Sequence, residues 1–231
     1  LGVVSAYKRG GKIDSGLVTT SLILYSLPTF WMGLILIFIF TSTLQWFPHA
    51  GTFPPEWAFG RPVPYTIKTD SSSTVLGIQF AINPGETIKF LGGYLRHAFL
   101  PILTLTLFSY GGYLLLTRAT MLEVLTEDYI VTARAKGVSE RTVLLRHALK
   151  NASLPLITSA ALSFGFILSG AIITETVYTY EGLGHWIWSG IQARDYPVVL
   201  PIFYIIAICV IAANFIADLL YGIIDPRIKY A

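Results

Sequence analysis

Charged residues are scarce in this sequence. Asp, Glu, Lys and Arg together make up 13% of its 231 residues, whereas 54% of the residues are hydrophobic. An ordinary soluble domain has roughly a quarter of its residues charged. With about half that share and a mean hydropathy of +0.64, the composition predicts a membrane protein.

Cysteine and the common catalytic motifs are also missing or nearly so. Cys209 is the single cysteine, which excludes an internal disulfide and a zinc site built from cysteines. The one Gly-Lys pair continues with Ile13 and lacks the earlier glycine of a P-loop, and no G-x-S-x-G motif is present. The four histidines, which are His49, His97, His147 and His185, are not spaced as metal ligands. We therefore predict transport rather than catalysis, with no catalytic, cofactor-binding or metal site in this chain.

Long apolar runs are the feature that the sequence has in abundance. A helix needs about 20 mostly apolar residues to cross a hydrocarbon core of about 30 Å. Four segments meet this requirement: 17–44, 98–121, 156–178 and 198–223. We expect an all-α, polytopic helical bundle in a lipid membrane, with a long loop at 45–97 and a second connection at 122–155.

Lys and Arg are unevenly divided between the two sides of these predicted spans. Cytoplasmic loops collect basic residues, so we place 122–155 inside. Eleven basic residues then lie inside: Lys8, Arg9, Lys12, Arg118, Arg134, Lys136, Arg141, Arg146, Lys150, Arg227 and Lys229. The other 5 lie outside: Arg61, Lys68, Lys89, Arg96 and Arg194. This alternation explains the net charge of +3 without a nucleic-acid partner.

The outer loop at 45–97 is rich in Pro, Gly, Ser and aromatic residues. Its apolar residues Leu76, Ile78, Phe80 and Ile82 alternate, which predicts one short half-buried strand. Long loops of this kind are usually functional or disordered. We expect a folded cap over the spans and keep direct contact with substrate as the alternative.

Several residues inside the predicted spans are candidates for a gate or a pathway. Pro28 lies mid-span and should kink its helix, while Gly165 belongs to a small-residue stripe that favours close helix packing. Asn214 and Asp218 share one face of the last span, and we expect a hydrogen-bonded pair rather than a proton relay. Each of these features has a packing interpretation beside the functional one.

The densest basic segment lies in the middle of the chain, within 122–155. Its residues to Arg134 favour a helix, Gly137 interrupts it, and Ser139 is a candidate N-cap for a second, amphipathic helix from Glu140 to Leu149. The small residues in this helix–Gly–helix elbow permit close approach to a partner, and its cations suit acidic or helix C-terminal groups. A basic amphipathic segment lying on anionic lipid is the alternative.

The sequence of this basic segment shows a specific resemblance to a known family. The segment "EDYIVTARAKGVSERTVLLRHALKNASLPLIT" resembles the cytoplasmic signature loop of ABC-importer permeases of the dipeptide/oligopeptide/nickel family. The resemblance continues, in the family's order, through "YSLPTFWMG", "WFPHAG", "HAFLPILTL", "ETVYTYEGLG", "RDYPVV" and "IDPRIK". Aligned on Gly137, the chain has Val131-Thr132-Ala133 where the broader importer signature has Glu-Ala-Ala, which fits the peptide-type branch.

The resemblance implies a fold, a location and partners. Members have two further spans upstream, giving six, and Leu1–Lys12 matches the segment that follows the second of them, so we expect a fragment of a multi-pass protein in a bacterial or archaeal cell membrane. A homologous second permease, two ATPase subunits that bind ATP and magnesium, and an extracytoplasmic solute-binding protein are the implied partners. The expected coupling residues lie within 129–150: Tyr129, Ala133, Arg134, Ala135, Lys136, Gly137, Arg141, Arg146 and His147.

An outer element is also implied by this resemblance. The family's E-x-x-x-x-x-x-G-L-G pattern runs here from Glu175 through Gly182 to Gly184. We expect the two glycines to allow a sharp backbone turn, and Glu175 to accept hydrogen bonds or pair with a cation. A helix end is one interpretation of this element, and an outer gate is the other.

Two questions of function stay open at the level of sequence. An ion-driven secondary transporter is the rival to an ATP-driven importer, and it predicts inverted repeats and ionisable residues at mid-membrane. The cargo is expected to be a peptide or a similar solute, with an oligosaccharide or nickel as alternatives.

Overall fold

The computed structural model describes residues 1–52, 65–69, 78–82, 84–168 and 171–224, and these residues are mostly helical. The elements are α1 (Gly2–Tyr7), α2 (Lys12–Ser26), α3 (Thr29–Leu36), the π-helix η1 (Ile37–Thr43), β1 (Tyr65–Thr69), β2 (Ile78–Ile82), α4 (Pro84–Val124), α5 (Asp128–Ala135), α6 (Glu140–Thr142), the π-helix η3 (Val143–Ala148), α7 (Leu149–Leu168), α8 (Ile172–Val177), α9 (Leu183–Ala193) and α10 (Tyr196–Ile224).

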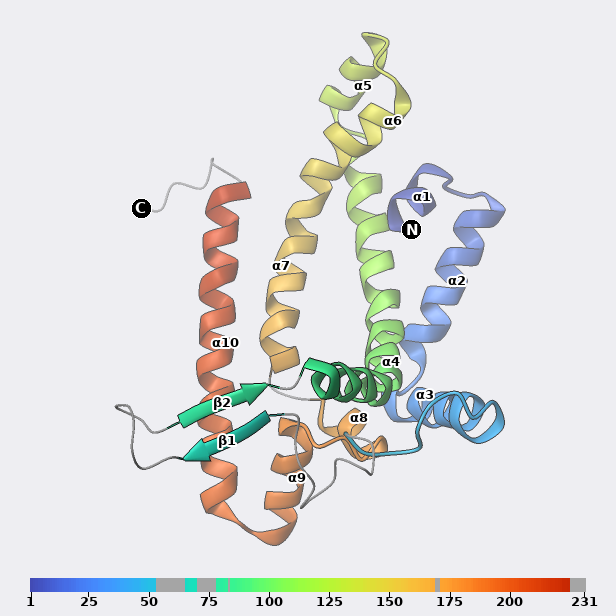
Figure 1. The fold of residues 1–231 in the computed structure, drawn as a ribbon. Coiled ribbons are helices and arrows are strands. Elements are labelled where there is room, and N and C mark those ends of the chain that lie inside the picture. The colour runs from blue at the N-terminus through green and yellow to red at the C-terminus, as the bar shows by residue number, and fades with distance from the viewer. Residues whose placement is uncertain (53–64, 70–77, 83, 169–170, 225–231) are drawn as a thin grey trace.

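Four long helices form the body of the molecule. α2 packs on α4, α4 on α7, and α7 on α10. In Figure 1, α2, α7, α10 and the later part of α4 run in roughly the same direction, whereas the first part of α4 lies across them. α5 and α6 project at one end, which we call the elbow end. α3, α8, α9 and the two strands lie toward the other end, which we call the outer end. The predicted helical bundle is confirmed in this arrangement.

The helices that could cross a membrane differ in detail from the predicted spans. Within the described residues, Ile88–Val124 of α4 and Tyr196–Ile216 of α10 are long and apolar enough to do so. The pair Lys12–Ser26 and Thr29–Thr43 also qualifies if its two bent halves form one span. The predicted span 156–178 is divided between α7, which ends at Leu168, and α8, which begins at Ile172. The chain is therefore membrane-embedded, and the count of four spans stays a prediction.

The predicted kink at Pro28 is a complete break. α2 ends at Ser26, and the axes of the helices on either side of the break differ by 101°. Leu27 and Pro28 are both extended, with ψ values of 132° and 137°. Proline disfavours helical backbone in the residue before it, so the sequence ends α2 here, and α3 then leaves across the bundle (Figure 1).

A small hairpin adds to the helical fold. β1 and β2 pair antiparallel, with Tyr65 opposite Ile82 and Thr69 opposite Ile78. β2 contains most of the predicted strand, whereas Leu76 lies outside the described residues. β1 was not predicted, because the alternation in its sequence "YTIKT" is short, with only Tyr65 and Ile67 as apolar residues.

Close packing against α4 depends on glycine at two positions, one in α4 itself and one in α1. A Cβ at Gly111 of α4 would lie 2.5 Å from the carbonyl oxygen of Ser21 in α2. A Cβ at Gly2 of α1 would lie 2.5 Å from the Thr117 Cβ of α4. Small residues at membrane-helix interfaces allow such backbone approach, so α1 and α2 are both held tightly against α4.

Candidate functional sites at the two ends of the bundle

The elbow consists of α5, α6 and η3 and stands on a hydrophobic core of its own. Ile130 of α5 and Val143 of η3 are completely buried, and they pack with Met121 at the end of α4. Ala148, Ala152 and Ala6 complete this elbow core. Because α1, α4, α5 and η3 all contribute to it, the core fixes the elbow to the elements around it.

Gly137 ends the first elbow helix in a left-handed conformation, with φ of +75°. Its N–H donates to the Arg134 carbonyl at 2.9 Å, and the Val138 N–H donates to the Ala133 carbonyl at 3.2 Å. These two bonds, with Val138 and Ala133 both against the elbow core, make a Schellman motif. No atom lies within 4 Å of a Cβ built on Gly137. The predicted interruption at Gly137 is therefore confirmed, and its cause is backbone conformation.

One ion pair crosses the corner of the elbow. The Arg134 Nη2 and Nε atoms donate to the two Glu140 carboxylate oxygens at 2.7 and 3.2 Å. The hydrogen bond from Arg134 lowers the pKa of Glu140, and the same bond raises the pKa of Arg134. Both side chains are solvent-exposed by more than a third, so water screens most of this attraction.

The second elbow helix does not end where the sequence predicted. Helical backbone continues from Glu140 through η3 into α7 and reaches Leu168, so the expected boundary at Leu149 is wrong. Ser139 does occupy the N-cap position, but its hydroxyl lies 2.9 Å from that of Thr142 rather than on a backbone N–H. The elbow helix and α7 therefore share one continuous helical backbone, with Pro155 inside α7.

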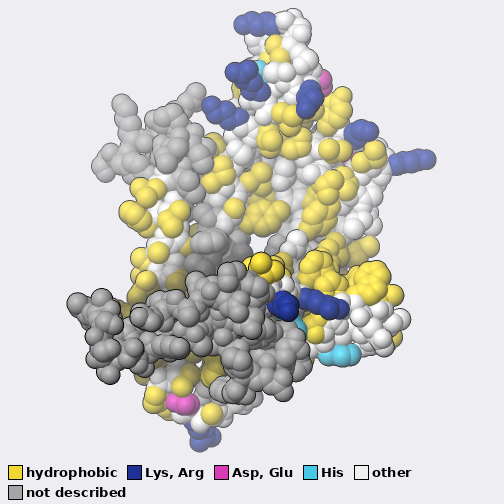
Figure 2. All heavy atoms as spheres, viewed as in Figure 1, with side chains coloured by type: hydrophobic (Ala, Val, Ile, Leu, Met, Phe, Trp, Pro, Cys, Tyr) yellow, Lys and Arg dark blue, Asp and Glu magenta, His cyan; other side chains and the backbone are white. Residues whose placement is uncertain are grey.

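Most of the predicted coupling residues are exposed on the elbow. Tyr129, Arg134, Ala135, Lys136, Gly137, Arg141 and Arg146 are exposed, while Ala133 and His147 are half-buried. Figure 2 shows Lys and Arg side chains over this end of the visible face and hydrophobic side chains over the bundle. The Tyr129 hydroxyl accepts a 2.6 Å hydrogen bond from the Asn151 side chain of α7. Most of the predicted coupling residues are thus exposed, and their coupling role stays a prediction.

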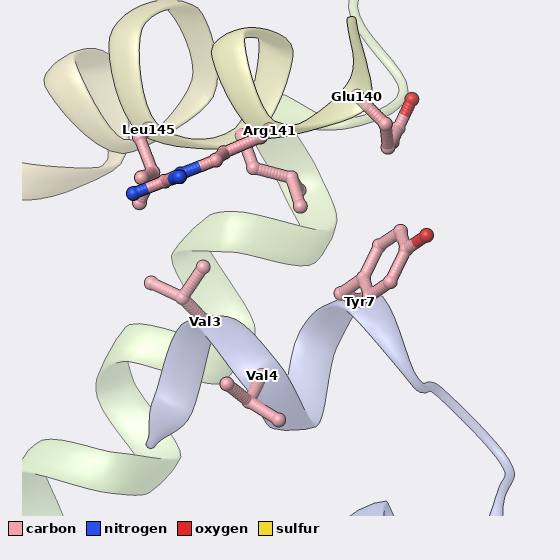
Figure 3. Close-up of a pocket in the computed structure, with 7 residues that line it drawn as sticks. Val3, Val4, Tyr7, Glu140, Arg141 and Leu145 are labelled. Carbon is pink, nitrogen blue, oxygen red and sulfur yellow. The ribbon is translucent and has the colours of Figure 1, made fainter.

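A mainly apolar pocket of about 300 Å³ lies between α1 and part of the elbow. Figure 3 shows Val3, Val4 and Tyr7 of α1 on one side and Arg141 and Leu145 of the elbow on the other. Glu140 and Leu144 complete its lining. Nothing in the sequence pattern predicted this pocket, because it depends on how α1 folds back against the elbow.

An ion pair with a buried carboxylate joins α2 and α4, and it was missed from the sequence. Arg118 of α4 donates from Nε and Nη2 to the two oxygens of Asp14 in α2, at 2.7 and 2.8 Å. Asp14 is only 3% exposed, and it also accepts from the Ser5 hydroxyl and the Gly10 N–H. A charge at the end of an apolar run is expensive unless paired, and Arg118 at the end of the predicted span 98–121 was the available signal.

Glu175 forms the centre of the outer site, which we call the outer cap. Its Oε1 accepts from the Ala171 N–H at 3.0 Å, at the start of α8. Its Oε2 accepts from the His185 N–H at 2.8 Å, in the first turn of α9. One carboxylate therefore satisfies free N–H groups at the N-termini of two helices, where negative charge is favoured. The prediction that Glu175 accepts hydrogen bonds is confirmed, and both oxygens are used within the chain.

The two glycines of the outer cap have a different purpose from the one predicted. Gly182 has φ of −101°, and of the residues in this corner it is Thr179 that takes positive φ, at 49°. A Cβ at Gly182 would lie 2.5 Å from the Glu175 carboxyl carbon, and one at Gly184 would lie 2.7 Å from the Ile172 backbone nitrogen. The expectation of a sharp turn made by the glycines is wrong. They provide space for the carboxylate and for the backbone of α8.

Tyr178 anchors the outer cap to the bundle. Its side chain is buried, and its hydroxyl lies 2.9 Å from that of Thr104 in α4 and donates to the Gly33 carbonyl of α3 at 3.3 Å. It packs with Met32, Leu36 and Leu100 in a second hydrophobic core. The sequence gave no indication of this contact, which joins residues 74 and 145 positions apart.

The remaining pathway candidates are not brought together by any described contact. Gly165 lies in α7, and Asn214 is exposed on α10 one turn before Asp218. The side chains of Gly165's neighbours in the small-residue stripe and of Asp218 lie outside the described residues, so the expected Asn214–Asp218 pair stays a prediction. Among the residues that the structure describes, no group of three His, Cys, Asp and Glu side chains is placed to hold a metal ion.

Comparison with known proteins defines the family. Residues 1–230 match the family of inner-membrane components of binding-protein-dependent transport systems, and the chain belongs to this family.

Named relatives extend over nearly the whole chain. The di/tripeptide transport system permease protein DppB of Pseudomonas aeruginosa strain UCBPP-PA14 is 40% identical over 229 residues, which cover 99% of this chain and 65% of that protein. The dipeptide transport system permease protein DppB of Escherichia coli K12 is 38% identical over 232 residues, covering 100% of this chain and 65% of the relative. The oligopeptide transport system permease protein AppB of Bacillus subtilis strain 168 is 37% identical over 229 residues, covering 99% and 63%. The chain thus spans just under two thirds of the length of these relatives.

Proposed function

We propose that this protein is a permease subunit of an ATP-driven, binding-protein-dependent importer of dipeptides or short oligopeptides. In this proposal the chain itself is not catalytic. It pairs with a homologous permease and receives peptide from an extracytoplasmic solute-binding protein. Two ATPase subunits that bind ATP and magnesium drive it by contacting the cytoplasmic segment 122–155. The family and the names of the relatives support this assignment.

The elbow is the observation that carries the proposal. It presents exposed cations on a projection that has its own buried core, and it is connected at both ends to long helices, α4 and α7. A partner that grips this projection can displace it without unfolding it, because Ile130 and Val143 would have to leave an apolar core for the elbow to deform. The elbow therefore has the properties of a lever.

Alternating access follows from this lever. ATP binding would draw the ATPase subunits together, and each elbow would carry its α4 and α7 with it. At the outer end, Tyr178 ties the outer cap to α3 and α4, so a movement of α4 reaches the segment around Glu175. Opening of that segment toward a docked binding protein is the outer-gate interpretation of the cap.

Uptake by the reconstituted complex tests the function. The full-length permease pair and ATPases are placed in liposomes, and entry of a labelled dipeptide is followed with the binding protein outside and ATP inside. We expect uptake that requires both ATP and the binding protein. Uptake driven by an ion gradient in the absence of ATPase subunits would instead support a secondary transporter. Parallel assays with an oligosaccharide and with nickel decide between the alternative cargoes.

A further inference from the structure

The pair formed by the buried Asp14 and the half-buried Arg118 joins three helices at the elbow end. Arg118 of α4 makes two hydrogen bonds to Asp14 of α2, at 2.7 and 2.8 Å. The Ser5 hydroxyl of α1 donates to Oδ1 of the same carboxylate, and the Gly10 N–H in the turn before α2 donates to Oδ2 at 2.9 Å. Each carboxylate oxygen thus has two donors, and the four donors come from three residues: Ser5, Gly10 and Arg118.

α1 connects this pair to the elbow. Ala6, the residue after Ser5, is buried in the elbow core together with Met121 and Ile130. Met121 lies one helical turn beyond Arg118 in α4. At the other end of α1, Gly2 lies so close to Thr117 that a Cβ there would be 2.5 Å from the threonine Cβ. α1 is therefore held between the elbow core and α4 along its whole length.

α2 needs such a connection because its backbone does not run into the elbow. α4 and α7 lead directly into the elbow, whereas α2 follows α1 and ends at the break before Pro28. It packs on α1 and α4, and Asp14 is its charged contact with both. Beyond the break, α3 holds its Gly33 carbonyl against Tyr178, so a movement of α2 would be passed on to the outer cap.

We propose that Asp14 and Arg118 are positioning residues that make α2 follow the elbow when the partner ATPases move it. A bidentate arginine–carboxylate pair fixes both distance and orientation. Separating the two groups would leave the buried Asp14 carboxylate without its charged partner, which is unfavourable. The inference rests on the proposed function and assigns these two residues to energy transmission rather than to peptide contact.

A distance measurement on a protein with the Asp14–Arg118 pair intact tests the transmission directly. Spin labels are placed at Glu127 in the turn before α5 and at Ile23 on α2, both exposed, in a chain with Cys209→Ala. The assembled complex is studied with and without a non-hydrolysable ATP analogue. We expect the label-to-label distance to stay constant when the nucleotide is added, and to change or broaden in the Asp14→Asn complex. A change of the same size in both complexes would overturn the inference.

The ratio of peptide imported to ATP hydrolysed separates transmission from simple anchoring. In Asp14→Asn we expect this ratio to fall several-fold while stimulated ATP hydrolysis persists, and Arg118→Lys, which keeps the charge and loses the planar fork, should lie between it and wild type. Asp195→Asn is the matched control, because this carboxylate is exposed in the turn before α10 and asparagine caps a helix as well as aspartate does. We expect the wild-type ratio in the control.

The double variant Asp14→Asn with Arg118→Gln covers the case in which a single change prevents assembly. Removing both charges leaves no unpaired ion in the interior, so this complex should assemble and still show the reduced ratio. A wild-type ratio in any assembled Asp14 variant would contradict the inference and leave the pair as an anchor. By contrast, a wild-type complex that imports no peptide with ATP and binding protein would contradict the proposed function itself.

Discussion

The elbow and the outer cap each contain a glycine at a helix end, Gly137 just after α5 and Gly184 in the first turn of α9, and the two glycines are required for different reasons. Gly137 has φ of +75°, and a Cβ there would meet no atom within 4 Å. Gly184 has no positive φ, and a Cβ there would lie 2.7 Å from the Ile172 nitrogen and 2.8 Å from its Cα. The elbow needs a backbone conformation, whereas the outer cap needs space.

This difference suits the functions proposed for the two ends. The elbow surface around Gly137 is open, so that a partner can approach it, and its conformation is maintained from beneath by the elbow core. The outer cap is filled by the Glu175 carboxylate, which uses both oxygens to hold α8 and α9 together. An open end is suited to contact with another subunit, and a filled end is suited to holding its helices in a fixed arrangement.

Gly184→Ala should have the largest effect on stability. The new Cβ would overlap backbone atoms of Ile172, which cannot rotate away as a side chain can. Overpacking of this kind costs about 1–3 kcal/mol and occasionally more. We expect a clear fall in the thermal unfolding midpoint of the purified protein, together with a lower yield. An unchanged midpoint would show that space is not the requirement at this position.

Gly182→Ala should be less severe and should depend on Glu175. Its Cβ would overlap the Glu175 carboxyl group, which can swing aside at the expense of its two hydrogen bonds, each worth about 0.5–1.5 kcal/mol, or more because the acceptor is charged. In a Glu175→Ala background, Gly182→Ala should therefore cost little, while Gly184→Ala should keep most of its cost. A double-mutant cycle measures this coupling. Additive effects at Gly182 and Glu175 would contradict the contact.

Substitutions at Gly137 should follow conformational preference rather than size. Alanine pays about 1–2 kcal/mol for the left-handed conformation, and asparagine tolerates that conformation better. We therefore expect Gly137→Asn to unfold at a higher temperature than Gly137→Ala, although asparagine is larger. The reverse order would mean that the elbow glycine, like Gly184, is limited by space.

The exposed pair of Arg134 and Glu140 should have the smallest effect. Exposed ion pairs contribute at most about 1 kcal/mol, so Glu140→Gln should scarcely alter the unfolding midpoint. Because Arg134 lowers the pKa of Glu140 in the folded protein, the contribution is present above the ordinary value of 4.5 and is lost as the pH falls through the lowered pKa. A comparison of wild type and Glu140→Gln at neutral and acid pH, at low salt, checks the sign. A gap between them that widens toward acid pH would contradict it.

Local patterns were sufficient to predict the elbow but not its surroundings. The basic segment and the break at Gly137 follow from composition and from glycine's conformational freedom, which are properties of neighbouring residues. The coupling residues were singled out by the resemblance to the permease family, and their role stays a prediction. The Asp14–Arg118 pair and the Tyr178 contacts join positions that are 104, 74 and 145 residues apart. No periodicity in the sequence reports such distances, so these contacts required the folded chain.

The outer cap lies between these two cases. The family pattern from Glu175 through Gly182 to Gly184 marked residues that do contact one another, and the prediction of a hydrogen-bonding carboxylate was correct. The reason for the glycines was wrong, because a glycine that provides space and a glycine that adopts positive φ look the same in sequence. At Pro28 the sequence likewise located the feature and underestimated it, since a predicted kink became a bend of 101°.

Peptide uptake by Gly137→Arg, compared with Gly10→Arg, tests the central claim that the elbow surface receives the driving subunits. Both glycines have φ of +75° and open space around a Cβ, and both are exposed, so the two substitutions impose the same backbone strain. Arginine at position 10 keeps the backbone N–H that donates to Asp14. Only Gly137 lies on the elbow. With uptake expressed per assembled complex in liposomes, the account predicts that Gly137→Arg abolishes ATP-dependent uptake and that Gly10→Arg retains most of it. Equal uptake by the two variants would contradict it.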